Sequence, residues 1–296
     1  MTNTGVLKTV RPVVSLSGAT LTPPPMNPAT RERLEANLAQ VKTAYEANPD
    51  DPENIIWVGR RTAYLSGYHE AIDIYTEGLK KFPDHYKLLR HRGHRYISVR
   101  QFDRAIADLE RAARLIEGVQ DQVEPDGAPN RYNIPTSSNH FNIWYHLGLA
   151  YYLKGDFENA LRCFTENKKF VYNFDALVAN SDWLYMIYRR LGREQEAKTL
   201  LEPIRNDLSI IENDAYFKRL RMYKGEIAPA DLLGTGGGDL DRELALATQG
   251  YGVANWYLYN GQIEKAKEMF TQIIKSPSWA AFGYIAAEAE LNRTAK

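Results

Sequence analysis

"WYHLGLAYYLKGDFENALRCF", residues 144–164, reads as two short helices joined by a tight turn. Gly155 marks the turn, because glycine tolerates the positive φ that such a helix end requires. Gly148 and Ala160 are small enough to let the two helices approach closely, and the Phe164 ring fills the space between layers. The stretch therefore predicts an antiparallel helix pair.

The same pattern recurs along the chain. Gly59 and Gly93 align at an offset of 34 residues, and Gly192 and Gly261 occupy the turn position in two weaker copies. One helix pair cannot bury its apolar face alone, so neighbouring pairs must stack. The predicted copies cover residues 52–85, 86–117, 141–174, 178–204 and 247–277.

This pattern resembles the tetratricopeptide repeat (TPR) family. Residues 144–164 are close to the family consensus, and Pro83 fits the proline that closes each unit. The resemblance implies an all-α, TPR-type α-solenoid of about five helix-turn-helix repeats with capping helices. It also implies a concave face, lined by the first helix of each pair, that binds peptides or protein partners.

The segments around the repeats complete the predicted organisation. Residues 1–29 form an extended Pro-rich arm, and residues 30–296 form one TPR superhelical domain. A helix from Thr30 to about Asn48 caps the start of the stack, because Pro49 ends it. The tail 278–294 reads as a final capping helix.

Two segments interrupt the helical pattern. Residues 118–140 hold three prolines and two glycines without a helical period, and so predict an inserted loop. The loop is either a surface excursion or a flap over the groove. Residues 209–227 should be helical, and the Gly-rich run 232–243 reads as a connector ahead of a helix that starts near Asp239.

Composition excludes several classes of protein. Lys+Arg and Asp+Glu both total 37, so the net charge is zero, whereas a general nucleic-acid binder would be basic. The single cysteine, Cys163, cannot form an internal disulfide or a Cys-rich zinc site. No apolar run approaches the roughly 18 residues that span a membrane.

The start lacks a signal peptide, so the default compartment is the cytoplasm, or the periplasm if a signal was trimmed.

One helix carries an unusual charge pattern. Between His85 and Phe102 there are five Lys/Arg residues, three histidines and no acid. Arg92 falls at a place that normally packs inward, where a charged side chain needs a partner or a wet cavity. The helix therefore predicts either an anion-binding face or an internal ion pair.

The family resemblance implies which residues would line the groove. A cationic end with an aromatic continuation suits an anionic group, since Arg binds carboxylates through two hydrogen bonds. The carboxylate clamp of chaperone-binding TPR domains is not reproduced, because Ile56 and Arg60 replace its first lysine and asparagine. The candidate ligand-binding residues are Arg60, Tyr64, Lys87, Arg90, His91, His94, Asn142, Tyr145, His146 and Asp182.

Two other functions fit the same residues. The first is an enzyme or small-molecule binder with a His/Arg/Tyr pocket closed by the 118–140 loop, although no nucleophile motif is present. The second is an oligomeric scaffold.

Three histidines, His91, His94 and His146, could converge. The helix that carries His91 and His94 lacks a carboxylate, and the chain has no HExxH motif, so no metal or cofactor is expected. The expected partner is a protein or peptide with an acidic or carboxylate group.

Overall fold

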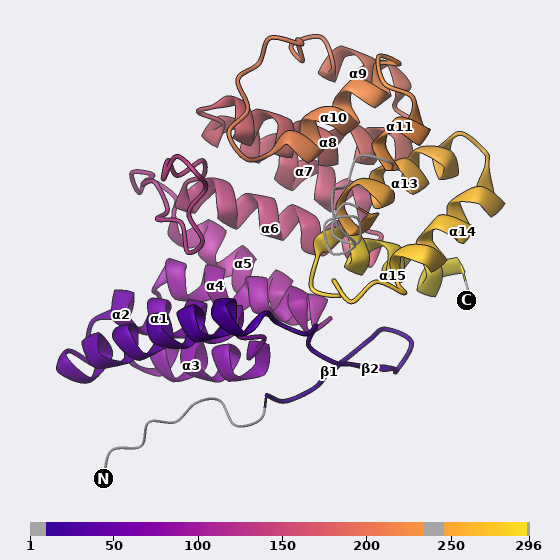
Figure 1. Cartoon of the computed structure of the whole chain (residues 1–296). Helices are drawn as coiled ribbons and strands as arrows, with labels where there is room; N and C mark the ends of the chain where they lie inside the picture. Colours follow the sequence, from indigo (N-terminus) through magenta and orange to yellow (C-terminus); the bar gives the residue numbers. More distant parts are fainter. Residues whose placement is uncertain (1–9, 234–245, 295–296) are drawn as a thin grey trace. The chain divides into compact units, whose positions relative to one another are not determined.

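The computed structural model describes residues 10–233 and 246–294, and nearly all of its regular structure is helical (Figure 1). The chain divides into two compact units, Met1–Gln120 and Asp121–Lys296, called unit 1 and unit 2 below. The prediction of an all-α fold built from helix pairs is confirmed. The single domain predicted over residues 30–296 stays a prediction, and each unit is described by itself.

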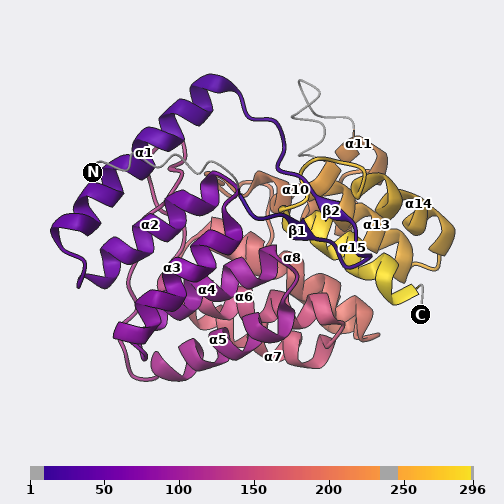
Figure 2. The same ribbon diagram turned by 90° about the horizontal axis from the view of Figure 1, so that it is seen from below.

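Unit 1 contains the first two predicted repeats and the capping helix before them. Its helices pack in chain order, each against the next (Figure 2). Asn27 and Asp51 begin two of these helices by accepting a hydrogen bond from a backbone N–H, with proline in the first turn. The helices are α1 (Pro28–Ala47), α2 (Pro52–Tyr64), α3 (Tyr68–Lys81), α4 (Tyr86–Ser98) and α5 (Phe102–Leu115).

The described part of the N-terminal arm is not wholly extended. It contains a short antiparallel hairpin of β1 (Val13–Val14) and β2 (Thr20–Leu21). Ahead of the hairpin, the Arg11 guanidinium binds Glu70 and Asp73 on α3 at 3.1 and 2.5 Å. The arm is therefore tied to the first repeat, a feature that its proline content did not predict.

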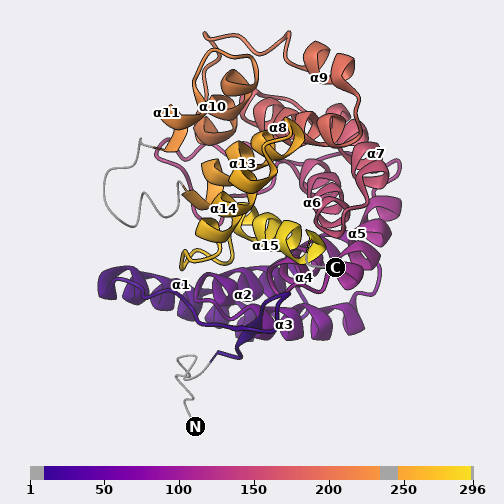
Figure 3. The same cartoon turned by 90° about the vertical axis from the view of Figure 1, so that its right-hand side faces the viewer.

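Unit 2 contains the other three repeats and further helices. The last two helices of the chain pack against each other, and the final one also reaches the first helix of the unit (Figure 3). The elements are α6 (Asn139–Lys154), α7 (Phe157–Asn167), η1 (Lys168–Phe170), α8 (Phe174–Arg190), α9 (Glu194–Leu200), α10 (Asp214–Tyr223), α11 (Pro229–Leu233), η2 (Leu246–Gly250), α13 (Tyr251–Tyr259), α14 (Ile263–Ile273) and α15 (Phe282–Thr294).

The helix predicted over residues 209–227 is shorter than expected. It begins only at Asp214, because the buried Asp175 carboxylate accepts hydrogen bonds from the backbone N–H groups of Ile211, Glu212 and Asn213. Those bonds hold the preceding residues in a loop. Most of the Gly-rich run, and the helix start predicted near Asp239, lie outside the described residues.

The turn positions behave as predicted in three repeats and differ in two. Gly155, Gly192 and Gly261 have φ values of 83°, 71° and 80°. In the first two repeats the same left-handed conformation is adopted by Ser66, with φ 66°, and by Arg100, with φ 62°. A side chain raises the energy of this conformation, so these two turns are locally strained.

The small residues on the first helices permit the close packing that the sequence predicts. A Cβ atom on Gly59 would lie 2.3 Å from the Tyr75 ring, and one on Gly93 would lie 2.7 Å from Leu109. A Cβ atom on Gly148 would lie 2.6 Å from Phe164. Each glycine therefore receives a large side chain from the second helix of its own pair.

Within unit 2 the first helices of the repeats are covered by later parts of the chain. α8 packs against α10 and α13, and α15 packs against α13, α14 and α6. The tyrosines Tyr152 and Tyr251 are buried in this interior and share a 2.6 Å hydrogen bond. Among the described residues, no helix combines the length and apolar character needed to cross a bilayer.

Candidate functional site

Two cations of α4, Lys87 and Arg92, receive acidic partners from neighbouring helices. Lys87 Nζ lies 2.7 Å from Glu53 Oε1 of α2. Arg92 donates from Nε and Nη2 to the two carboxylate oxygens of Asp108 on α5, both at 2.7 Å. The partner that the sequence required for Arg92 is thus present, and the absence of acids within α4 is compensated from outside it.

Arg90 and His91 belong to the interior of unit 1. Arg90 is 7% exposed, and its Nη1 lies 2.9 Å from His91 Nδ1. A guanidinium can only donate, so Nδ1 must be the acceptor and His91 is the neutral tautomer protonated on Nε2. The imidazole also stacks on Tyr75, at 5.9 Å between centroids. His94, by contrast, is half-buried.

A second basic cluster lies at the start of the first repeat. The guanidinium groups of Arg60 and Arg61 lie 4.5 and 5.1 Å from the Trp57 ring centroid, and that of Arg61 also lies over Tyr64. Burial lowers the pKa of Arg61, and the positive charges of Arg60 and Arg33 lower it further. We call Arg33, Trp57, Arg60, Arg61 and Tyr64 the arginine–tryptophan surface.

Sequence reasoning found only Arg60 and Tyr64 of this surface. Trp57 was not among the predicted ligand-binding residues, and Arg33 lies on the capping helix, which the repeat register does not relate to α2. The sequence did contain a signal for this surface. Trp57 precedes Arg60 by three residues and Arg61 by four, and residues at these spacings are neighbours on one face of a helix.

In unit 2, Asn142 and His146 engage the inserted loop and their own helix. Asn142 Nδ2 donates to Glu124 Oε2 at 3.0 Å and to Ser137 Oγ at 2.9 Å. His146 Nδ1 lies 2.5 Å from the Asn142 carbonyl oxygen. Its ring also packs edge-on against Phe282. These contacts anchor the start of α6 to its surroundings.

Tyr145 and Asp182 are also engaged within unit 2. The Tyr145 hydroxyl accepts a hydrogen bond from Trp183 Nε1 at 2.7 Å and lies 2.9 Å from the Tyr216 hydroxyl. Burial raises the Tyr145 pKa well above its usual value. Asp182 binds Arg219 through both carboxylate oxygens. The sequence-predicted residues of this unit therefore have internal partners.

The inserted loop is fixed to unit 2 at several points. Its two arms form an isolated bridge between Val123 and Ser138, and Asn173 Nδ2 donates to the Thr136 carbonyl oxygen at 2.9 Å. Most of the loop contains no helix. Its role as a flap stays a prediction. Among the described residues, no group of three His, Cys, Asp or Glu residues could hold a metal ion.

Comparison with known proteins gives one family match. Residues 141–166 match the sequence model of the tetratricopeptide repeat. No curated protein matches the chain.

Solved structures of repeat proteins are similar to the chain at low identity. One is YrrB, described as a TPR protein with an unusual peptide-binding site. It has 15% identity and a TM-score of 0.43, with 82% of this chain and 95% of that chain covered. Another is MamA, with 14% identity and a TM-score of 0.45, covering 69% of this chain and 100% of that chain.

The matched repeat and the helix pairs agree in position. Residues 141–166 span α6 and nearly all of α7, and four further pairs in the described ranges have the same two-helix form. Stacked repeats of this type present surfaces to protein partners, so a general protein-interaction role follows. The chain thus contains a tetratricopeptide repeat over residues 141–166, within a series of helix pairs of the same form.

Proposed function

We propose that this chain is a protein- or peptide-binding TPR module in which the arginine–tryptophan surface of unit 1 accepts an anionic group of the partner. The observation that carries the proposal is the pairing of Arg60 and Arg61 over the Trp57 ring, with Arg33 close enough to lower the Arg61 pKa. Like charges at this spacing repel one another, and a bound carboxylate would relieve that repulsion.

Aromatic rings lie beside these arginines. A guanidinium that stacks on an indole loses little of its hydrogen-bonding capacity, because its N–H groups lie in the plane of the fork. Arg60 and Arg61, with their guanidinium carbons 4.5 and 5.1 Å from the Trp57 ring centroid, can therefore bind a carboxylate beside the indole. Tyr64 adds a further ring beside Arg61.

The other predicted ligand-binding residues fit this proposal less well. Lys87 already pairs with Glu53, and Arg90 already donates to His91. In unit 2, ligand binding would require each predicted residue to leave an internal partner. We therefore restrict the proposal to the arginine–tryptophan surface and leave out Asn142, Tyr145, His146 and Asp182.

The test uses two peptides that differ only in charge. Isothermal titration would compare an acetylated, amidated hexapeptide of five glutamates and one tyrosine with its glutamine counterpart, using the full chain. We expect the glutamate peptide to bind more tightly, and its affinity to fall as salt is raised. Arg60→Ala and Arg61→Ala should each weaken it roughly 1.5- to 5-fold, the range for exposed charge contacts.

Arg205→Ala is the matched control, because Arg205 is an exposed arginine of unit 2 that pairs with Asp207. It should leave the affinity unchanged. Equal affinity for the two peptides, or equal losses in the Arg60, Arg61 and Arg205 variants, would contradict the proposal.

A further inference from the structure

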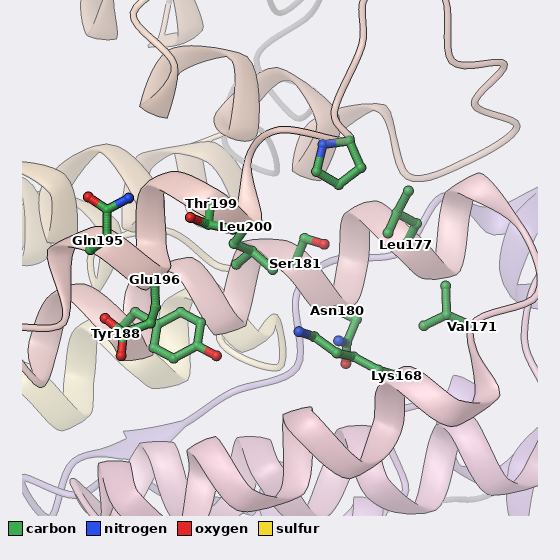
Figure 4. Close-up of a pocket in the computed structure, with 11 residues that line it drawn as sticks. Lys168, Val171, Leu177, Asn180, Ser181, Tyr188, Gln195, Glu196, Thr199 and Leu200 are labelled. Carbon is green, nitrogen blue, oxygen red and sulfur yellow. The ribbon is translucent and has the colours of Figure 1, made fainter.

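Unit 2 contains a pocket of about 530 Å³ that the proposed function does not use. It lies between the end of one helix pair and the next, and its lining comes from η1, α8, α9 and the residues after them (Figure 4). Its volume falls within the roughly 300–1,000 Å³ of typical ligand sites. The lining residues are Lys168, Val171, Leu177, Asn180, Ser181, Tyr188, Gln195, Glu196, Thr199, Leu200 and Pro203.

The pocket arises where α9 is short. This helix ends at Leu200, a turn earlier than the corresponding end of α7, and the chain then turns away through Pro203. Proline cannot continue a helix, because it lacks an N–H and clashes with the preceding turn. The first half of α8 is consequently left with an open space above Leu177 and Ser181.

The pocket combines apolar walls with a polar floor. Val171, Leu177 and Leu200 supply aliphatic surface, and Figure 4 shows Ser181 and Asn180 between the Leu177 end and the Tyr188 end. Asn180 and Ser181 are both 2% exposed. Buried polar groups of this kind favour a ligand that returns hydrogen bonds to them.

The Asn180 amide is held in a fixed orientation. Its Oδ1 accepts from Asn167 Nδ2 at 3.0 Å, and its Nδ2 donates to the Phe164 carbonyl oxygen at 3.2 Å. An amide side chain has two N–H donors and two acceptor lone pairs. One of each remains for a ligand, which matches the donor and acceptor of a peptide backbone.

The rim of the pocket is positive. Lys168 is exposed and forms no ion pair with any residue that the structure describes. Glu196 at the other end of the pocket stays ionised, but its negative charge is compensated by Arg193. Arg193 Nε donates to Glu196 Oε1 at 2.8 Å and lowers the Glu196 pKa. An acidic group on the ligand would therefore be attracted to Lys168.

We propose that this pocket binds a peptide segment of a protein partner that carries an apolar side chain next to an acidic residue. The apolar side chain packs between Leu177 and Leu200, the backbone bonds to Asn180, and the acid meets Lys168. A fatty acid would share the apolar and acidic groups, but its acyl chain could not bond to the second donor and second acceptor of the Asn180 amide. This site lies in unit 2 and is separate from the arginine–tryptophan surface.

The experiment uses three probes with the full chain. They are acetyl-Gly-Leu-Leu-Asp-Gly-amide, its analogue with asparagine in place of aspartate, and decanoate, each titrated by saturation-transfer NMR. We expect the aspartate peptide to bind wild type roughly 1.5- to 5-fold more tightly than the asparagine analogue, as for an exposed charge contact. Lys168→Gln should remove that difference.

Two variants separate this pocket from the rest of the surface. Thr199→Trp places a large ring at the exposed rim and should abolish binding of both peptides. Lys169→Gln is the control, because Lys169 is the adjacent exposed lysine, pairs with Glu166 and does not line the pocket. It should behave as wild type, and so should Arg60→Ala.

Four results would overturn the proposal. They are no binding of the aspartate peptide at about 1 mM, equal affinities for the two peptides, binding that survives Thr199→Trp, and tighter binding of decanoate than of either peptide. The last result would identify an acyl-chain site instead. If the glutamate peptide did not bind to the arginine–tryptophan surface, the four outcomes for this pocket would keep their meaning.

Discussion

Arg219 binds Asp182 through two hydrogen bonds inside unit 2, from Nε to Oδ1 at 2.9 Å and from Nη2 to Oδ2 at 2.5 Å. The two residues are 2% and 0% exposed. Burial alone would lower the Arg219 pKa, but the Asp182 carboxylate outweighs it and the pKa is raised. Arg219 lies on α10, outside the repeat pattern, so the pair fastens an added helix onto α8.

Asp182→Asn should destabilise the protein strongly. The substitution keeps the shape of the side chain but leaves the Arg219 charge without compensation in the interior, which costs about 3–5 kcal/mol. The free energy of unfolding, measured by urea denaturation, should fall by that amount. The double variant Asp182→Leu, Arg219→Met should recover much of the loss, because two apolar side chains replace the charges. A loss below about 1 kcal/mol for Asp182→Asn would show that the charge is not buried.

This pair also shows why the candidate site was only partly predictable. The helix face of Asp182 was predicted from the repeat register. The repeat register does not show which residues cover that helix face. α10 and α15 lie outside the repeat pattern, and it is their packing in unit 2 that supplies Arg219 and Phe282 as partners for predicted groove residues.

Gly59→Ala should be destabilising although alanine favours helices. The added Cβ would lie 2.3 Å from Tyr75 Cε1, and the ring cannot move away because Tyr75 is fully buried. Overpacking of this kind costs about 1–3 kcal/mol. Thermal unfolding followed by circular dichroism should show the loss. Combining the change with Tyr75→Leu should cost less than the sum of the two single changes, whereas strict additivity would contradict the contact.

The repeats themselves were predictable because their signals are local. A turn glycine, a small residue and an aromatic at fixed spacing each answer a requirement within one helix pair, and α6 with α7 meets all of them. The ion pairs of α4 were less accessible. The sequence shows that Arg92 needs a partner, but it does not show that Asp108, sixteen positions later, supplies it.

Ser66→Gly should stabilise the protein by about 0.5–1 kcal/mol. Ser66 has φ 66°, a left-handed conformation that a side chain disfavours and glycine does not. Gly192→Ser is the reciprocal change, at the same turn of a later repeat, with φ 71° and no atom within 4 Å of an added Cβ. It should destabilise by a similar amount in the same urea titration. Changes of the same sign in both variants would show that the turn conformation is not responsible.

The start of α4 should make stability depend on pH. His85 is the N-cap of this helix, and its Nδ1 accepts a hydrogen bond from the Leu88 N–H at 3.4 Å. Burial lowers the His85 pKa below its usual value of 6.5, and nearby Lys87 lowers it further, against the opposing effect of Glu53. The neutral ring is therefore the form that stabilises the fold. Its contribution is complete above pH 6.5 and is lost as pH falls through the folded-state pKa.

His85→Asn isolates this contribution, because asparagine caps a helix N-terminus and does not titrate in this range. Between pH 7.5 and pH 5 the free energy of unfolding of the wild type should fall by about 1 kcal/mol more than that of the variant, the typical value of an N-cap. Burial also lowers the pKa of His140, but that residue is present in both proteins and cancels in the comparison. Urea titrations at the two pH values measure the difference directly. If the wild type and His85→Asn lost the same free energy of unfolding between pH 7.5 and pH 5, removal of the His85 imidazole would have had no effect. The pH dependence would then have to arise from other groups.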